Sequence, residues 1–289
     1  MSSGSTVTCP SAASPMLEMI FSSRILLNQG EQLDPEEGQA VDAALSLALA
    51  DLKAEFMDPE TGRIHYEAMH GSELFRMYEG LANGLRSFPL EDLRQRDQRL
   101  AFWINVYNAA VIHGVVRLGI RRSVREVPNF FKRVSYQVGG HLFSLHHMEH
   151  GILRGNRRPP YGLLKPFGRG DPRRAFWVQP LDPRIHFALV CGARSCPPVG
   201  FYEGDRVEFQ LELASLSFIN GPGVKFLKES KTLLLSRIFK WYKGDFGGMG
   251  GVMDLLLRYL DPGEVKEAIS QKRERLSIRF EPYDWALNE

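Results

Sequence analysis

The stretch FWINVYNAAVIHG at residues 102–114 decides how this chain folds. Within it and on either side, apolar side chains recur every three or four residues, which is the spacing of one face of an α-helix. The members of this face are Leu100, Ile104, Tyr107, Val111 and Val115. Since the rest of the stretch is also mostly apolar, the pattern predicts a buried helix from about Glu91 to Arg117.

Two more helices are expected on the N-terminal side of this stretch. Asp34 can cap the first, because a proline and two glutamates follow it, and an Ala- and Leu-rich run then continues to about Phe56. Ser72 can cap the second, an amphipathic segment that Pro89 ends. Ser, Thr, Gly and Pro dominate residues 1–15, which are predicted to form a disordered tail.

Beyond the buried helix, the period of the apolar pattern changes to two residues. This alternation, interrupted by Gly139-Gly140, predicts a hairpin over residues 134–143. Ser144 can then cap a short helix that reaches Arg154. The other expected elements are a strand at 185–190, helices at 207–218, 252–259 and 262–272, a hairpin formed by 224–227 and 233–235, and a last strand at 276–280.

The order of these elements indicates the fold class. Helices come first and strands mixed with helices follow, which predicts an α+β fold rather than regular βαβ winding. The length of 289 residues allows one large domain or two small ones, and 44% hydrophobic residues are enough for a sizeable core. We expect a helix-rich single domain over residues 16–289, packed around a small mixed or antiparallel sheet.

Charge and hydropathy narrow the classes of partner. A net charge of +2 is only mildly basic, and the basic residues form pairs rather than a contiguous stripe, which argues against a nucleic-acid partner. The pairs are Arg121-Arg122, Arg157-Arg158 and Arg173-Arg174. No stretch approaches the roughly 18 consecutive apolar residues that span a bilayer, and no Lys or Arg precedes the first apolar run as in a secretory signal. We therefore expect a cytoplasmic protein without a membrane partner, and no pattern indicates a cofactor.

Two asparagines interrupt the apolar helix at 102–114. Asn105 and Asn108 are three residues apart, so they point to roughly the same side, and buried amides must find hydrogen-bond partners. One interpretation is that they tie neighbouring loops to the helix. The other is that they orient a catalytic histidine or hold a substrate, and we predict them, together with Arg154, as substrate-binding residues. His113, farther along the helix, is expected to be a core histidine.

The segment SLHHMEHGILRG at 144–155 contains a carboxylate where an apolar side chain is expected. At 100° per residue, Glu149 falls among the buried apolar positions, which is costly unless the carboxylate is paired or hydrogen-bonded. His150 lies about 100° farther round the helix and is not expected to reach it. We therefore predict a partner from another segment: His186, His113 or an asparagine of the buried helix.

The same segment holds two histidines at a spacing typical of helical metal ligands. His146 and His150 are four residues apart and share one flank of the predicted helix. The signature of the zinc proteases is incomplete, because the glutamate does not follow the first histidine directly. We therefore assign no metal ligand to this pair.

The segment RIHFALVCGARSCPPVGFY at 184–202 carries two cysteines after the expected strand, where a rigid sheet commonly positions a functional loop. Cys191 and Cys196 are free to pair, to ligate a metal or to act as thiols, and thiols normally stay reduced in the cytosol. A cysteine nucleophile needs a thiolate, and His150 and His186 are the available bases. The alternative is a structural loop in which both cysteines pack as small hydrophobic side chains.

Four runs of the sequence resemble the family known as domain of unknown function 547. They are FWINVYNAAVIHG at 102–114, YQVGGHLFSLHHMEHGILRG at 136–155, DPRIHFALVCGARSCPP at 182–198 and YDWALN at 283–288. The resemblance covers roughly residues 90–245, and relatives that join this domain to redox or signalling modules imply thiol chemistry by association. The positions carried over are Glu149, His150, His186, Cys191 and Cys196. His146 departs from the family pattern, in which an acidic residue or asparagine is more familiar.

These residues lead to three hypotheses about function. The first is a cysteine-dependent hydrolase or acyl transferase that acts on a small molecule or a peptide. Its catalytic residues would be Cys191 or Cys196 as the nucleophile, His150 or His186 as the base, and Glu149 or Asn105 as the group that orients the imidazole. The second is a metal or thiol-redox site. The third is a binding module that recognises a partner through the Arg-rich loop at 155–180, where Tyr161 and Phe167 are expected to be exposed.

Overall fold

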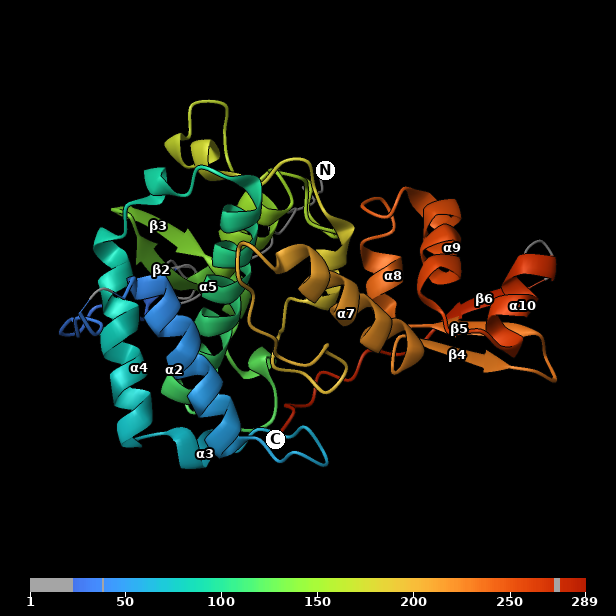
Figure 1. Ribbon diagram of the computed structural model, residues 1–289, viewed down its shortest axis with the longest axis horizontal. Helices are drawn as coiled ribbons and strands as arrows, with labels where there is room; N and C mark the ends of the chain where they lie inside the picture. The colour runs from blue at the N-terminus through green and yellow to red at the C-terminus, as the bar shows by residue number, and fades with distance from the viewer. Residues whose placement is uncertain (1–22, 38, 273–275) are drawn as a thin grey trace, which may run out of the picture.

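Helix α5 (Arg96–Arg117) is the central element of the structure (Figure 1). The computed structural model describes residues 23–37, 39–272 and 276–289, and the predicted tail at 1–15 lies outside them. Every residue from Leu100 to Val116 is buried, which confirms the predicted buried helix. The helix begins later than residue 91 because Gln95 and Gln98 cap its N-terminus reciprocally.

Helices α2 (Val41–Phe56) and α4 (Glu73–Gly84) pack against each other, on the left of Figure 1. Ser72 caps α4 as predicted, because its hydroxyl accepts a backbone hydrogen bond at 3.1 Å.

The predicted helix start at Asp34 is wrong. A glycine at position 38 separates the acidic residues from the Ala- and Leu-rich run, and glycine is a poor helix former. The short helices of this region are α3 (Tyr66–Met69) and the 3₁₀ turns η1 (Leu85–Ser87), η2 (Leu90–Asp92) and η3 (Val124–Glu126).

The first hairpin is confirmed and belongs to a three-stranded mixed sheet. Strand β2 (Val134–Val138) pairs antiparallel with β3 (His141–Ser144) and parallel with the short strand β1 (Ile25–Leu26). The turn consists of Gly139 and Gly140, with φ angles of 54° and 75° that L side chains rarely adopt. The short helix α6 (Phe130–Arg133) leads into the sheet.

The second predicted hairpin is also confirmed, in a second three-stranded sheet on the right of Figure 1. Strand β5 (Thr232–Leu235) pairs antiparallel with β4 (Val224–Leu227) and parallel with β6 (Ser277–Phe280). The helices of this half of the molecule are α7 (Val207–Asn220), α8 (Arg237–Trp241), α9 (Gly248–Tyr259) and α10 (Glu264–Lys272).

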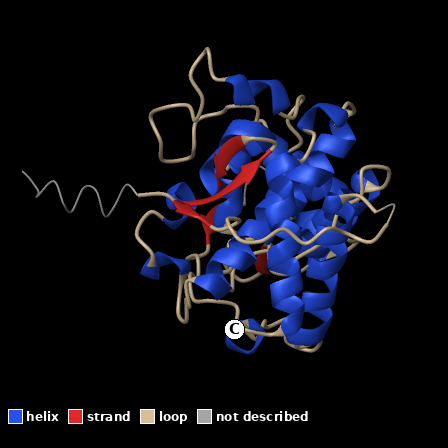
Figure 2. Cartoon of the chain, turned by 90° about the vertical axis from the view of Figure 1, so that its left-hand side faces the viewer, coloured by secondary structure: helices blue, strands red, loops and turns tan. Residues whose placement is uncertain are grey.

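The fold class is α+β, as predicted, and helices form a much larger part of the molecule than strands do (Figure 2). The structure contains two small mixed sheets where one was expected. The larger group of buried hydrophobic side chains surrounds α5 and the first sheet. A smaller group lies against the second sheet and is rich in aromatic rings: Phe187, Phe218, Phe239 and Phe246.

The prediction of a strand at residues 185–190 is wrong. The chain there forms the 3₁₀ helix η6 (Pro183–Phe187), which the Asp182 side chain caps by accepting a hydrogen bond from a backbone N–H at 3.0 Å. Directly afterwards, the amide of Asn108 accepts from the Val190 N–H and donates to the Ala188 carbonyl, both at 3.0 Å. Because a side chain takes these hydrogen bonds, the apolar run needs no neighbouring strand.

The segment that follows β3 is a π-helix and then a long connection. The π-helix η4 (His147–Leu153) begins where the Ser144 hydroxyl accepts the His147 N–H, close to the predicted cap. Within the connection, which contains the 3₁₀ turn η5 (Pro172–Phe176), the predicted exposure of Phe167 is wrong. The Asn156 amide bonds to both the N–H and the carbonyl of Phe167 at 2.9 Å and draws that residue inward.

The buried Asn28 gives the first testable prediction. Its amide donates to the carbonyls of Ala82 and Gln137 and accepts from the Gln137 N–H, so it joins the first sheet to α4. Asn28→Ala leaves these backbone groups unpaired, and we expect it to lower the free energy of unfolding by about 1–3 kcal/mol. Urea unfolding measures this loss, with the exposed Gln29→Ala as the control. Equal stability of the two variants would contradict the assigned role.

Candidate functional site

A cavity of about 910 Å³ is lined by residues between 107 and 197 and by residues between 238 and 285. Its walls come from α5, η4, the loop at 159–166, residues 191–197 (the cysteine loop), α8 and residues 283–288 (the C-terminal segment). The five residues predicted as catalytic all line it: Glu149, His150, His186, Cys191 and Cys196. Residues far apart in the sequence therefore meet at one site.

The three residues predicted to bind substrate lie outside this lining. Asn108 holds the backbone at Ala188 and Val190. Asn105 holds Tyr202 through its N–H and its carbonyl, beside a second cavity of about 490 Å³. Arg154 is buried and bonds to protein groups. In this structure, both asparagines tie loops to the buried helix, which is the first of the two interpretations considered for them.

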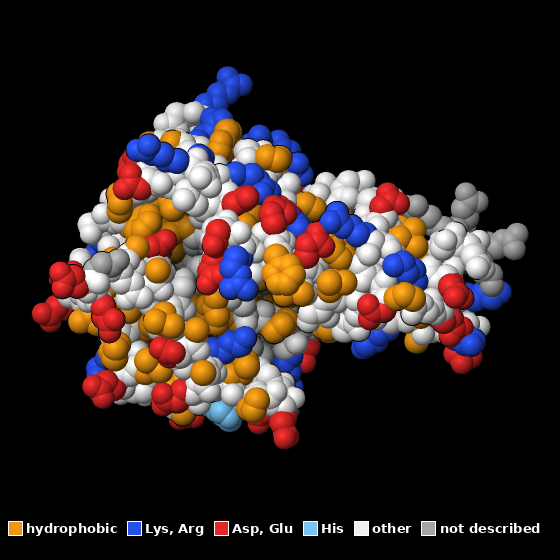
Figure 3. Space-filling model, in the orientation of Figure 1, with side chains coloured by type: hydrophobic (Ala, Val, Ile, Leu, Met, Phe, Trp, Pro, Cys, Tyr) orange, Lys and Arg blue, Asp and Glu red, His pale blue; other side chains and the backbone are white. Residues whose placement is uncertain are grey.

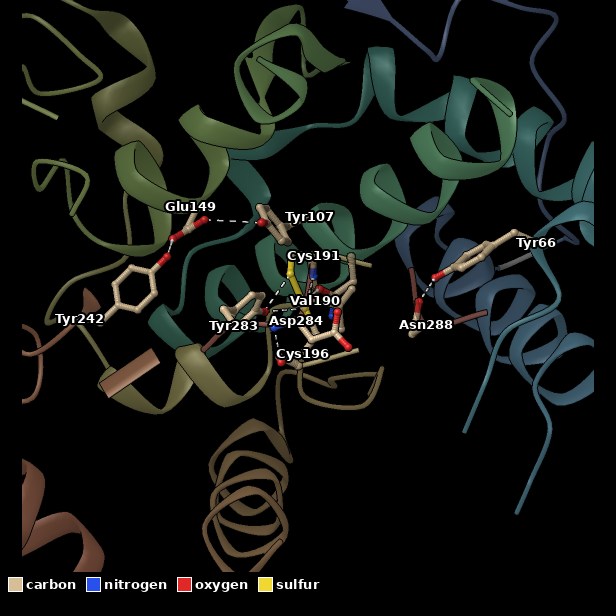
Figure 4. The surroundings of a disulfide bond; sticks show 12 residues. Tyr66, Tyr107, Glu149, Val190, Cys191, Cys196, Tyr242, Tyr283, Asp284 and Asn288 are labelled. Carbon is tan, nitrogen blue, oxygen red and sulfur yellow. Dashed lines mark hydrogen bonds between the residues drawn. A yellow bond between two sulfur atoms is a disulfide. The ribbon is translucent and has the colours of Figure 1, made fainter. Parts of the chain in front are cut away.

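Cys191 and Cys196 form a disulfide in the wall of the cavity (Figure 4). The expectation of reduced thiols does not hold in this structure. The Tyr283 hydroxyl lies 3.0 Å from the sulfur of Cys191 and 3.2 Å from that of Cys196, and the Cys191 N–H donates to the Cys196 sulfur at 2.9 Å. Within the described residues, no hydrogen bond joins a cysteine sulfur to a histidine nitrogen.

The C-terminal segment gives the cysteine loop its shape. The chain turns at Gly192, whose φ of 76° favours glycine, and the next residue forms an antiparallel bridge with Leu287. The Arg194 N–H donates to the Ala286 carbonyl at 2.8 Å, which continues this pairing. Pairing with the loop brings Tyr283, near the start of the same segment, against the sulfur atoms.

The predicted partners of Glu149 are wrong. Its carboxylate accepts hydrogen bonds from the hydroxyls of Tyr242 (2.6 Å) and Tyr107 (3.4 Å), as Figure 4 shows. His150, which was not expected to reach it, has its Nδ1 3.2 Å from the carboxylate. Burial and then the Glu149 charge raise the pKa of both tyrosines well above the usual value, so they remain hydrogen-bond donors at neutral pH.

A second polar group surrounds Asp245, which sequence reasoning missed. The buried carboxylate accepts from Arg154 Nε at 2.6 Å, from Arg157 at 3.0 Å and from His186 Nε2 at 2.9 Å. Burial alone would raise the pKa of Asp245, but the hydrogen bonds from His186 and Arg154 outweigh it and hold the pKa well below the usual range. The carboxylate therefore stays charged and orients the His186 ring, which stacks on Tyr242 with centroids 3.7 Å apart.

The histidines at the cavity are neutral at physiological pH. Burial, followed by nearby positive charge, lowers the pKa of His146 to about 4 and that of His147 to about 3. Burial and the charge of Arg154 hold the pKa of His150 well below its usual value. Burial also lowers the pKa of His186, although Asp245 opposes this effect. A neutral imidazole can accept a proton, so the cavity contains potential bases.

Aromatic rings line part of the cavity. Tyr283, Trp241 and Trp285 contact one another, with the Tyr283 centroid 4.8 Å from each tryptophan and the two tryptophan centroids 5.9 Å apart. Tyr161 meets Trp241 edge-on. An apolar wall facing a few polar groups is typical of a small-molecule or peptide site. In the described ranges, no group of three or more His, Cys, Asp or Glu side chains is arranged to hold a metal ion.

Fold and site together define an α+β protein whose aromatic cavity contains a disulfide and a buried carboxylate. Residues 90–219 match the family described as "Protein of unknown function, DUF547". This match confirms the resemblance seen in the sequence motifs of that part of the chain. No curated protein and no solved structure matches the chain. No helix in the described part of the chain is long and apolar enough to cross a membrane.

Four polar residues of the site were not predicted: Tyr107, Tyr242, Asp245 and Tyr283. Tyr107 stands on the apolar face of the buried helix, where its hydroxyl was an available signal because it must find a partner. Tyr283 belongs to the YDWALN run that resembles the family. Tyr242 and Asp245 lie beyond the matched segment, and no local pattern separates them from surface residues.

The histidine pKa values predict a loss of stability in mild acid. In the unfolded chain, His146 and His147 take up protons near pH 6.5, whereas in the folded protein they do so only near pH 4 and pH 3. Between these values the unfolded state binds more protons, so the free energy of unfolding should fall as the pH is lowered from about 6.5 toward 4. Urea unfolding at several pH values measures the fall.

A histidine variant isolates this effect. His147→Gln removes one of the two groups, so its stability should depend less steeply on pH than that of the wild type. The exposed His65→Gln controls for the number of histidines. A His147→Gln variant with the same pH dependence as the wild type would refute the assignment.

The Glu149 carboxylate gives the third prediction. Glu149→Ala leaves two buried tyrosine hydroxyls without their acceptor, and we expect a loss of about 1–3 kcal/mol in the free energy of unfolding. Glu149→Gln retains the volume and one acceptor oxygen, so it should lose clearly less and keep the fold. Chemical denaturation of both variants measures the difference. Equal losses would show that the charge, rather than the hydrogen bonds, is what the site requires.

Proposed function

We propose that the cavity is a thiol–disulfide exchange site, in which the Cys191–Cys196 pair oxidises thiols of a small molecule or a peptide. The single observation that carries this proposal is the position of the disulfide, in the wall of a large cavity and in contact with hydrogen-bond donors. Both cysteines are partly exposed, so a thiol that enters the cavity can reach them.

The reaction consists of two exchanges. A substrate thiolate attacks the Cys191 sulfur, a bond forms between these two sulfurs, and the electron pair of the protein disulfide leaves on Cys196. A second substrate thiolate then attacks the substrate sulfur of the mixed disulfide and releases Cys191. Two substrate thiols become one disulfide, the protein disulfide becomes two thiols, and the two protons of the substrate pass to the cysteines.

The donors around the sulfurs favour Cys196 as the leaving group. Its sulfur is contacted by both the Cys191 N–H and the Tyr283 hydroxyl, whereas the Cys191 sulfur has the tyrosine alone. Hydrogen bonds to a thiolate lower the pKa of its thiol, and the thiol with the lower pKa leaves faster. Attack on Cys191 is therefore the faster direction.

In the proposed reaction, His186 takes the proton of the incoming thiol. Its Nε2 bonds to Asp245, which leaves Nδ1 as the unprotonated nitrogen, and this atom has no hydrogen-bond partner within the described residues. The ring lines the cavity. Asp245 stabilises the imidazolium that forms, as the carboxylate of a catalytic triad does.

The same Asp245–His186 pair supports a second candidate, a cysteine-dependent hydrolase or acyl transferase. In the reduced protein, Cys196 would be the nucleophile, with His186 as the base and Asp245 as the residue that orients it. This candidate requires free thiols for activity, whereas the exchange reaction begins from the disulfide. The oxidation state of the active protein therefore separates the two.

A thiol count tests the proposed function. The chain has three cysteines, Cys9, Cys191 and Cys196, so protein purified without reductant and unfolded in denaturant should show one free thiol, and reduced protein three. Three free thiols before reduction would remove the exchange proposal. In that case, ester hydrolysis that alkylation abolishes would support the hydrolase.

Tyr283 tests the role of the donors. Tyr283→Phe removes one hydrogen bond to the leaving thiolate, and reduction of the disulfide by dithiothreitol should slow by about tenfold. Tyr161→Phe is the matched control, because its hydroxyl has no hydrogen bond to either sulfur within the described residues. Equal rates for the Tyr283 and Tyr161 variants would contradict the proposed stabilisation of Cys196.

A further inference from the structure

We propose that the loop from Arg158 to Gly170 docks this protein onto an anionic lipid surface. Its tip carries three large apolar side chains, Tyr161, Leu163 and Leu164, which are 80%, 86% and 81% exposed. The other large hydrophobic residues exposed in the described chain lie between 38% and 58%. Such exposure of neighbouring apolar side chains is costly in water and is typical of an interaction surface.

The charge of the loop indicates what covers this tip. From Arg158 to Gly170 the sequence contains three basic residues and no acidic residue. All three, Arg158, Lys165 and Arg169, are exposed, and none forms an ion pair with a described residue. The neighbouring Arg157 and Arg173 differ, because Asp245 and Asp171 neutralise them. The loop therefore presents uncompensated positive charge beside its apolar tip.

A second element adds to the same surface. Lys132 of α6 is exposed and lines the same cavity as Lys165 of the loop, so basic side chains from two elements lie at this cavity. Elsewhere, on the face drawn in Figure 3, basic and acidic side chains are interspersed. Apolar side chains that enter the acyl region and basic ones that remain among anionic headgroups form the usual pattern of a lipid-docking element.

The base of the loop is held in place, which favours docking. Asn156 bonds to the N–H and carbonyl of Phe167, and the Phe167 ring stacks on His147 with centroids 5.3 Å apart. A tip presented by a fixed base loses less conformational entropy on binding than a free segment does. The expectation of no membrane partner rested on spanning length and on the N-terminal sequence, and a docking loop depends on neither.

A protein partner fits these observations less well. Specific protein interfaces place polar groups in fixed directions, whereas the three basic side chains of this loop have no ion pair that would orient them within the described residues. A fluid layer of anionic headgroups satisfies such cations in any arrangement. The inference stands apart from the exchange reaction, since docking requires neither cysteine.

Vesicle sedimentation tests the inference with the full chain. We expect binding to vesicles of phosphatidylcholine with phosphatidylserine, weak binding to phosphatidylcholine alone, and release by added salt. Leu163→Ser with Leu164→Ser, and separately Arg158→Ser with Lys165→Ser, should each weaken binding by about tenfold. Because these side chains are exposed, we expect the melting temperature of each variant to stay within roughly two degrees of the wild-type value.

Matched substitutions on α7 are the control. Phe209→Ser with Leu213→Ser removes two other exposed apolar side chains, 58% and 48% exposed, and should leave vesicle binding unchanged. Equal affinity of the wild type for both kinds of vesicle would overturn the inference, as would unchanged binding by the loop variants. If the wild type binds no vesicles but does bind a protein partner, the loop belongs to a protein interface instead.

Discussion

The amide of Asn108 is the interaction on which the site depends. It projects from the buried helix α5 and holds the backbone of Ala188 and Val190, directly before Cys191. Because a buried amide must satisfy both its donor and its acceptor, it fixes this segment without a neighbouring strand. The cysteine loop therefore starts from a defined point on the most buried element of the molecule, and pairing with the C-terminal segment completes its shape.

Two buried carboxylates organise the cavity in different ways. Glu149 lies among tyrosine hydroxyls, whereas Asp245 lies among two arginines and His186. Each charge is compensated by donors from distant parts of the chain, which is what permits burial. Burial keeps the histidines neutral although the carboxylates oppose it, and the hydrogen bond to Asp245 leaves the other ring nitrogen of His186 free of that carboxylate.

The aromatic cavity and the loop at 158–170 present different kinds of surface. Inside, Trp241, Tyr283 and Trp285 offer flat apolar surface close to the disulfide. Outside, the loop combines an apolar tip with unpaired cations. Since residues 159–166 belong to both regions, an apolar compound concentrated at a lipid surface would meet the cavity opening directly.

The sequence by itself determined the buried helix, both hairpins and five of the residues that line the cavity, because periodicity, turn glycines and polar residues in apolar runs are local signals. Only the tertiary structure decided the partners of Glu149, the place of Asp245, the disulfide and the 3₁₀ turn at Pro183–Phe187. The hydrogen-bond partners of the Glu149 and His186 side chains lie 42 to 93 positions away, and the hydrogen bonds that replaced the expected strand come from Asn108. Local patterns predict that a buried polar group needs a partner, but which group meets it depends on how distant segments pack.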